Sequence, residues 1–142
     1  MVEPRQLNIF KGRRQRGVAL PAPKESKLHN DLVYLIDKWP APGSTWKYTH
    51  IASGEKRDIV TAVRLKRMGV KRGWPDFIFV ERARKQVFFL ELKRKGEWLS
   101  EEHEIISEHL MASGCGYLCT DSFKDAVDAL KMMGVLRAEV SA

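Results

Sequence analysis

Apolar residues three and four positions apart mark four helices along this chain. They are expected at about 26–39, 57–68, 100–113 and 122–133. Capping signals support two of these boundaries, because Ser100 precedes the acidic turn EEHE, which the helix dipole favours, and Gly69 follows the second helix. The second helix is expected to turn four side chains inward, those of Ile59, Ala62, Val63 and Leu65.

Shorter runs with β-branched and aromatic residues predict four strands between these helices. They lie at about 45–51, 75–80, 86–92 and 116–120, and the charged turn ERARK joins the middle two. The mixed order of elements, with no internal repeat, is typical of a sheet covered by helices. We therefore expect an α/β fold with a mixed sheet flanked by helices.

Charged residues stand at the ends of two predicted core strands. Side chains alternate between the faces of a strand, so Glu91 and Lys93 follow apolar residues on one face of the third strand. Asp76 stands at the start of the preceding strand. If these strands are antiparallel neighbours, the start of one lies beside the end of the other. Asp76, Glu91 and Lys93 are then expected to converge at one rim of the sheet.

These three charges suit the hydrolysis of a phosphodiester. Two carboxylates held close together repel each other without a counter-charge, and Mg²⁺ prefers oxygen ligands of this kind. A lysine beside such a site can orient the attacking water and neutralise charge on a phosphate. The bare pattern has another interpretation, in which Glu91 and Lys93 form a solvated ion pair and Asp76 caps a turn after Pro75, because such short motifs often arise by chance.

The formal net charge of +7 is distributed unevenly over the 142 residues. Residues 1–27 hold seven Lys and Arg against two acidic residues, and residues 56–72 hold seven against one. From residue 97 onward, nine acidic residues stand against three basic ones. Scattered Lys and Arg can simply keep a surface soluble, but two separate basic blocks in so short a chain favour a nucleic-acid partner.

The folded domain is expected to span 24–137, between a basic arm and a short tail at 138–142. Residues 1–23 are basic, poor in apolar residues and interrupted by prolines, which is typical of a flexible arm. No apolar stretch reaches the roughly 20 residues that cross a bilayer, and no signal sequence is recognisable, so we expect a cytoplasmic protein. Cys115 and Cys119 are expected to be reduced, buried thiols, not a disulfide or a zinc site.

Several motifs, in order along the chain, resemble one nuclease family. The pattern PD, fourteen further residues and then ELK is similar to that of the PD-(D/E)XK nuclease superfamily. Within it, the segments SGEKR, GWPDFIFV and VFFLELKRKGEWLSEEH resemble the VRR-NUC family, which includes small stand-alone phage and bacterial proteins. The resemblance extends from about residue 24 to residue 135. It implies a PD-(D/E)XK, restriction-endonuclease-like fold and the activity of a DNA endonuclease.

The same resemblance assigns roles to individual residues. It implies that Glu25, Asp76 and Glu91 hold Mg²⁺ or Mn²⁺, with the main-chain carbonyl of Leu92 as a further ligand. Lys93 would act on the attacking water. As in related enzymes, hydrolysis would leave a 5′-phosphate and a 3′-hydroxyl.

Two histidines stand where the family has glutamine. His103 replaces glutamine in the motif LSEEH, and helical spacing places it inward, on the stripe of Ile106 and Leu110; a surface position is the alternative. We expect His103 to support the site as a hydrogen-bond donor whose charge titrates near neutral pH. For His29 in the first helix, packing or a surface position is the favoured interpretation.

Contacts with DNA are expected from the basic second helix and the turns around it. We expect them from Arg57, Arg64, Lys71, Arg72, Ser53 and Trp74. Trp74 has an alternative role in packing beside a tight turn, and Ser53 in forming its own turn.

The domain carries no appended module that reads bases, so recognition of DNA shape is expected. Similarity to stand-alone members of the family implies a homodimer that acts on four-way junctions or other branched DNA, in repair or recombination in a bacterial or phage-infected cell. The alternatives are a sequence-specific or nicking restriction-type nuclease, and a nucleic-acid-binding module without activity.

Overall fold

The computed structural model of the chain describes residues 24–52 and 57–141. The arm expected at 1–23 and the turn residues Ser53 and Gly54 lie outside these ranges. The elements follow the order α1 (Glu25–Lys38), β1 (Trp46–His50), α2 (Ile59–Arg67), β2 (Phe77–Glu81), β3 (Gln86–Leu92), α3 (Glu101–Ala112), β4 (Gly116–Thr120) and α4 (Phe123–Met133). All of the predicted helices and strands are present, with boundaries shifted by at most two residues.

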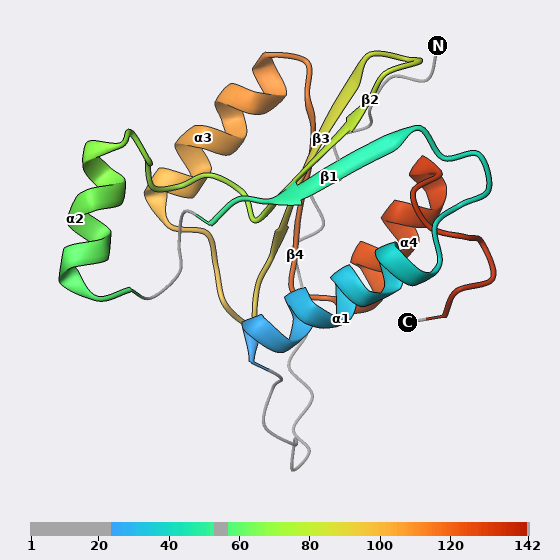
Figure 1. Cartoon of the computed structure of the whole chain (residues 1–142), viewed down its shortest axis with the longest axis horizontal. Coiled ribbons are helices and arrows are strands. Elements are labelled where there is room, and N and C mark those ends of the chain that lie inside the picture. Colours follow the sequence, from blue (N-terminus) through green and yellow to red (C-terminus); the bar gives the residue numbers. More distant parts are fainter. Residues whose placement is uncertain (1–23, 53–56, 142) are drawn as a thin grey trace. The chain divides into compact units, whose positions relative to one another are not determined.

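The four strands form one sheet in the order β1-β2-β3-β4 (Figure 1). Strands β2 and β3 are antiparallel. Strand β4 follows β3 through α3, and a helical crossover of this kind joins parallel neighbours. The expected α/β fold with a mixed sheet flanked by helices is therefore confirmed. The chain forms two compact units, the first from 24–46, 92–97 and 118–141 and the second from 47–91 and 98–117.

The β2–β3 hairpin is the centre of the second unit. Its register pairs Phe77 with Leu90 at one end and Glu81 with Gln86 at the turn, as the antiparallel prediction requires. Phe77 and Leu90 are fully buried, and so is Phe79 between them. This apolar footing fixes the position of the residues that directly precede β2 and end β3.

The turn of the hairpin contains a buried acid. The Glu81 carboxylate accepts hydrogen bonds from the main-chain N–H groups of Ala83 and Arg84, each at 2.7 Å. These bonds satisfy donors that the turn would otherwise leave unpaired, so Glu81 has a structural role. Lys85 adopts the left-handed conformation, φ 53°, that closes the turn.

The first unit packs α1 and α4 through apolar side chains. Leu32 and Ile36 of α1 are buried, and so are Val127 and Leu130 of α4. The indole Nε1 of Trp46 donates to the Met133 carbonyl at 2.9 Å, which ties the segment after α1 to the end of α4.

The two cysteines are free thiols. Cys119 is buried, as expected, whereas Cys115 is half-buried.

The prediction that α2 turns four apolar side chains inward is wrong. Ile59, Ala62 and Val63 are exposed, Leu65 is half-buried, and no residue of this helix is buried. Helical spacing correctly placed these apolar residues on neighbouring turns, but their burial depends on a packing partner, and none covers that side of α2 among the described residues of its unit.

Strand β2 begins at Phe77, two residues later than predicted. Pro75 has no N–H to give to a ladder. The N–H of Asp76 donates to the Glu91 side chain and not to a neighbouring strand. Both residues therefore precede the strand, at its rim.

Candidate metal centre

Asp76 is held through its main chain on both sides. Its N–H donates to Glu91 Oε2 at 3.0 Å. Its carbonyl accepts from the Ile51 N–H at 2.6 Å and from His50 Nδ1 at 2.8 Å. Because a carbonyl can only accept, His50 carries its proton on Nδ1. The peptide groups around Asp76 are fixed, and the predicted convergence of Asp76 and Glu91 at the rim is present.

Glu91 is a buried carboxylate, with 1% of its side chain exposed. Its Oε1 lies 3.4 Å from Nε2 of His103, and His103 Nδ1 lies 2.7 Å from the Ser100 hydroxyl oxygen. A buried carboxylate is costly unless nearby donors compensate it. One arrangement satisfies every group: His103 is protonated on Nε2, facing Glu91, and Ser100 donates to Nδ1. His103 thus faces inward, where helical spacing placed it.

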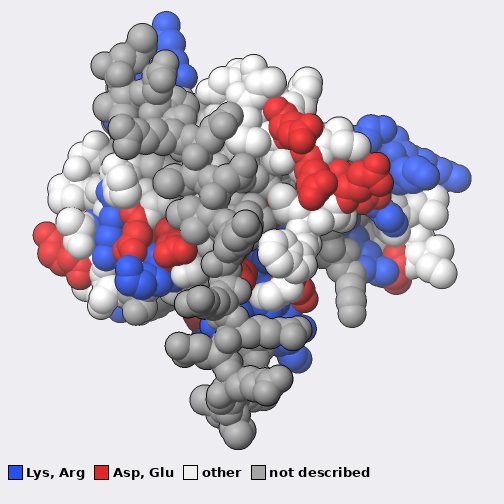
Figure 2. Space-filling view, turned by 180° about the vertical axis from the view of Figure 1, so that it is seen from behind, with Lys and Arg blue, Asp and Glu red and all other residues white. Residues whose placement is uncertain are grey.

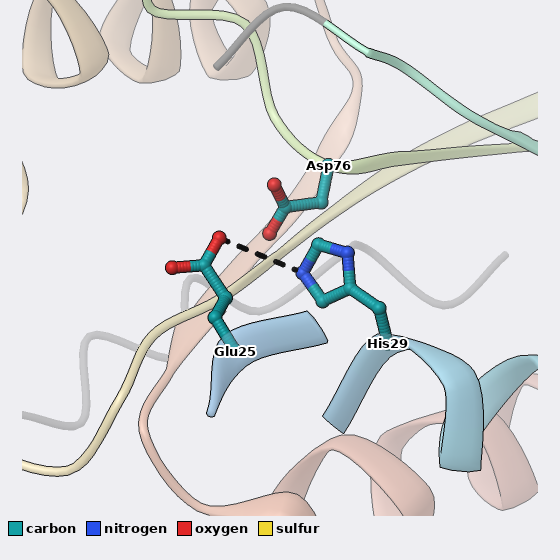
Figure 3. A group of neighbouring side chains, drawn as sticks. All are labelled: Glu25, His29 and Asp76. Carbon is teal, nitrogen blue, oxygen red and sulfur yellow. Dashed lines mark ion pairs between the residues drawn. The ribbon is translucent and has the colours of Figure 1, made fainter. Parts of the chain in front are cut away.

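Two further side chains come from the start of α1. Glu25 is its first residue, where the helix dipole favours a carboxylate. His29 lies one turn later, and its Nε2 is 3.8 Å from Glu25 Oε1 (Figure 3). In the first unit, Glu25 and His29 thus offer a carboxylate oxygen and an imidazole nitrogen as candidate metal ligands. His29, for which packing or a surface position was favoured, is half-buried and lies beside Glu25.

The chemistry of these donors fits the expected ion. Carboxylate oxygens are the ligands that Mg²⁺ prefers, and Mn²⁺ accepts carboxylate together with imidazole. Asp76 and Glu91, which lie together in the second unit, would offer carboxylate oxygens to such an ion, as would Glu25 in the first unit. The residues are suited to a hard divalent cation and lack the thiolates that would favour zinc or copper.

Lys93 directly follows β3, two residues after Glu91. Its N–H donates to the Thr120 carbonyl at 2.9 Å, and its side chain is half-buried. Alternation along an extended strand puts Lys93 on the same face as Glu91, with Leu92 between them on the opposite face. The side chain of Leu92 is buried, so this residue can offer a ligand only through its main-chain carbonyl.

The residues expected to contact DNA differ in their exposure. Arg64, Lys71 and Arg72 are exposed. The Arg57 guanidinium donates to the Ala52 carbonyl. Trp74 packs beside a buried ring, with its centroid 6.2 Å from that of Phe89, as its alternative role in packing describes. Ser53 lies outside the described residues.

His50 is the residue that the sequence left without a role. It ends β1, whose burial alternates so that Trp46, Tyr48 and His50 share the less exposed face. Its ring also lies against Phe77, with centroids 5.4 Å apart. The sequence could have drawn attention to His50, because it is a histidine at an inward position of a predicted strand. Nothing in the sequence connects it with Asp76.

The comparisons with known proteins bear on the fold. No protein-family model matches the chain, and no curated protein does. A solved structure described as a VRR_NUC domain protein is similar to it, with a TM-score of 0.56 and 18% sequence identity, over 78% of this chain and 87% of the other.

The chain has a VRR-NUC-like fold. At this level of identity the likeness concerns the fold alone, and it agrees with the PD-(D/E)XK-like fold expected from the motifs. The VRR-NUC-like fold of this chain combines the β2–β3 hairpin with carboxylates at its rim. No helix in the described part of the chain combines the length and the apolar character needed to cross a membrane.

Proposed function

We propose that this protein is a metal-dependent DNA endonuclease that hydrolyses phosphodiester bonds. One observation carries the proposal: the buried Glu91 carboxylate accepts the N–H of Asp76 at the rim of the hairpin. The Glu81 carboxylate is equally buried but accepts N–H groups of its own turn, whereas the Glu91 carboxylate lies between the Asp76 N–H and the His103 ring. A carboxylate at that place can serve as a ligand of a divalent cation. The VRR-NUC-like fold supports the same function.

The proposed ligands of the ion are Glu25, Asp76, Glu91 and the carbonyl of Leu92, with His29 as an additional candidate. Mg²⁺ or Mn²⁺ bound there would supply Lewis-acid chemistry to the phosphate and to the attacking water. Glu91 is suited to be a ligand because its carboxylate has a fixed orientation. The Asp76 N–H holds one of its oxygens, and His103 lies beside the other.

The remaining residues orient water and balance charge. Lys93, on the same strand face as Glu91, orients the attacking water and neutralises negative charge that builds on the phosphate. His103 supports the site by fixing Glu91. Protonation of the leaving 3′-oxygen gives a 3′-hydroxyl, and water adds to the phosphorus to give a 5′-phosphate.

The substrate we propose is branched DNA, such as a four-way junction, cut by a homodimer in the cytoplasm during repair or recombination. The exposed side chains of Lys71 and Arg72, in a chain of net charge +7, support an electrostatic contact with phosphates. Arg57 belongs to the same basic block of sequence, whereas Arg64 shares its face of α2 with apolar side chains. Such contacts position DNA without reading its bases.

A cleavage assay tests this function. Labelled four-way junction, flap and linear duplex are incubated with the wild-type protein and Mg²⁺ or EDTA, and with Asp76→Asn. We expect cleavage of the junction that EDTA and Asp76→Asn abolish, while Glu81→Gln, which alters a buried structural carboxylate, retains it.

The same assay separates the alternatives. Cleavage at one defined sequence of linear duplex would indicate a restriction-type or nicking nuclease. Binding of every substrate without cleavage in Mg²⁺ or Mn²⁺ would indicate a binding module, and cleavage that survives Asp76→Asn would contradict the proposed metal centre.

A further inference from the structure

Helix α2 presents an apolar face to solvent. Ile59, Val60, Val63 and Met68 are 83%, 78%, 45% and 73% exposed. Large apolar side chains scattered singly on a surface need no explanation, but a contiguous group usually marks an interaction site. In Figure 1, α2 stands at one end of its unit.

These side chains share one face with two arginines. Residues four apart lie one above the other on a helix, so Ile59, Val63 and Arg67 form one row, and Val60, Arg64 and Met68 form the row beside it. The six residues line a single shallow groove. Thr61 and Leu65, on the other side, are the half-buried ones. The groove therefore faces away from the unit that carries α2.

Helix α3 carries an exposed face of the opposite charge. Glu101, Glu104 and Glu108 are exposed, and they surround Ile105, which is 58% exposed. Ser107 and Leu110 are the buried residues of α3, so the acidic face points away from the core. Figure 2 shows a group of acidic side chains beside a group of basic ones at one end of the view. Apolar residues framed by arginine on α2 match an apolar residue framed by glutamate on α3.

We propose that α2 of one copy of this chain packs against α3 of a second copy, and the reverse, in a two-fold homodimer. In such an assembly each copy offers both surfaces, so the contact is made twice and closes. The proposal rests on the homodimer suggested above and names its contact surfaces. DNA is the poorer occupant, because burying isoleucine, valine and methionine against phosphates gains little, and α3 would repel them.

The oligomeric state of the full chain tests this interface. Light scattering coupled to size-exclusion chromatography is measured for the wild type, Val63→Glu and Met68→Glu. The matched controls are Val80→Glu on β2 and Met132→Glu on α4, whose side chains are 44% and 86% exposed. We expect a dimer for the wild type and both controls and a monomer for both α2 variants, all with unchanged circular dichroism. A monomeric wild type, or dimeric α2 variants, would overturn the proposal.

Exchange of charges tests the pairing of α2 with α3. Arg64→Glu with Arg67→Glu makes one variant, and Glu104→Arg with Glu108→Arg makes another. Each alone is expected to be a monomer, because both of its contacts place like charges together. A mixture of the two is expected to restore a dimer, since every contact again joins opposite charges. If the α3 variant alone remains dimeric, α3 is not the partner of α2.

DNA binding separates this proposal from the proposed function. Anisotropy of a labelled junction is measured with Val63→Glu. A wild type that is monomeric and loses DNA binding in this variant would assign α2 to DNA and overturn the interface. Loss of cleavage in Asp76→Asn with an unchanged dimer would support the metal centre and the interface independently.

Discussion

Two glutamates of equal burial lie at opposite ends of the β2–β3 hairpin. Glu81 and Glu91 are each 1% exposed, and each accepts main-chain N–H groups. Glu81 accepts hydrogen bonds from the turn residues Ala83 and Arg84. Glu91 joins Asp76 to His103. The two residues therefore allow the energetic effect of a buried carboxylate to be separated from its chemical role.

Alanine at either position should destabilise the fold to a similar extent. Loss of a partner for a buried N–H costs about 1–3 kcal/mol, so urea unfolding should show a decrease of this order in the free energy of unfolding for Glu81→Ala and Glu91→Ala. Cleavage of DNA, measured well below the unfolding transition, should disappear only in Glu91→Ala. Loss of cleavage in both variants would mean that the hairpin, and not the carboxylate, is what activity requires.

His50 positions Asp76 through its main-chain carbonyl. In His50→Phe the ring can still lie against Phe77, but the donor to Asp76 is lost. We expect the affinity for Mn²⁺, measured by calorimetry, to fall by up to about tenfold, as for partners that orient metal ligands.

Asparagine tests whether the hydrogen bond is the cause. The amide of His50→Asn can donate from nearly the position of Nδ1, so part of the affinity should return. Tyr48→Phe, on the same face of β1, should leave the affinity unchanged. Equal losses in His50→Phe and Tyr48→Phe would assign the effect to packing.

At the scale of elements, the segment between α2 and β2 passes close to α3. Gly73 has φ 87°, and a Cβ there would lie 2.6 Å from the Glu102 carbonyl oxygen. Gly69 has a similar φ, 93°, with nothing within 4 Å of an added Cβ. The start of α3 thus sets the path of the chain towards Pro75 and Asp76.

Alanine substitutions at Gly69 and Gly73 should separate the energetic cost of the left-handed backbone from that of the close approach to α3. Gly69→Ala should cost about 1–2 kcal/mol, the price of a left-handed residue with a side chain. Gly73→Ala should cost more, because the Glu102 backbone must also move, and it should slow cleavage by displacing Asp76. Chemical unfolding and initial rates of cleavage measure both. Equal destabilisation by the two substitutions would show that the approach to α3 is unimportant.

The N-cap of α2 should titrate below its usual range. The side-chain hydroxyl of Thr61 donates to Asp58 at 2.6 Å and its N–H at 2.9 Å, and these bonds lower the pKa of the Asp58 carboxyl. The ionised cap therefore stabilises α2 above the ordinary aspartate pKa, and this stabilisation is lost as pH falls through the lowered value.

Carbon-13 NMR of the Asp58 carboxyl measures this pKa. In Thr61→Val the hydroxyl is removed while the N–H remains, so the titration midpoint should rise towards the ordinary value. A midpoint that does not move would show that the hydroxyl is not the main cause of the lowered pKa.

At the scale of the whole molecule, local sequence patterns correctly predicted the features that depend on residues close together in the sequence. The alternation of strand residues and the short turn ERARK were enough to place Asp76 beside Glu91, and helical spacing turned His103 inward. The burial of Ile59 and Val63 was predicted wrongly, because spacing defines a face without supplying what packs on it.

Contacts between distant residues could not be predicted in this way. The hydrogen bond from His50 joins it to a carbonyl 26 positions away. Because every residue has a main-chain carbonyl, the sequence does not show which one accepts a given hydrogen bond.

Binding of Mn²⁺ is the most direct test of the central claim, that the carboxylates at the hairpin rim hold a divalent cation. Isothermal titration calorimetry of the full chain should show saturable binding that Asp76→Asn and Glu91→Gln each weaken by more than about tenfold, since each removes a charge from the ion's ligands. Glu81→Gln, which removes the buried carboxylate at the turn, should bind as the wild type does. Unchanged Mn²⁺ binding in Asp76→Asn and Glu91→Gln would contradict the account.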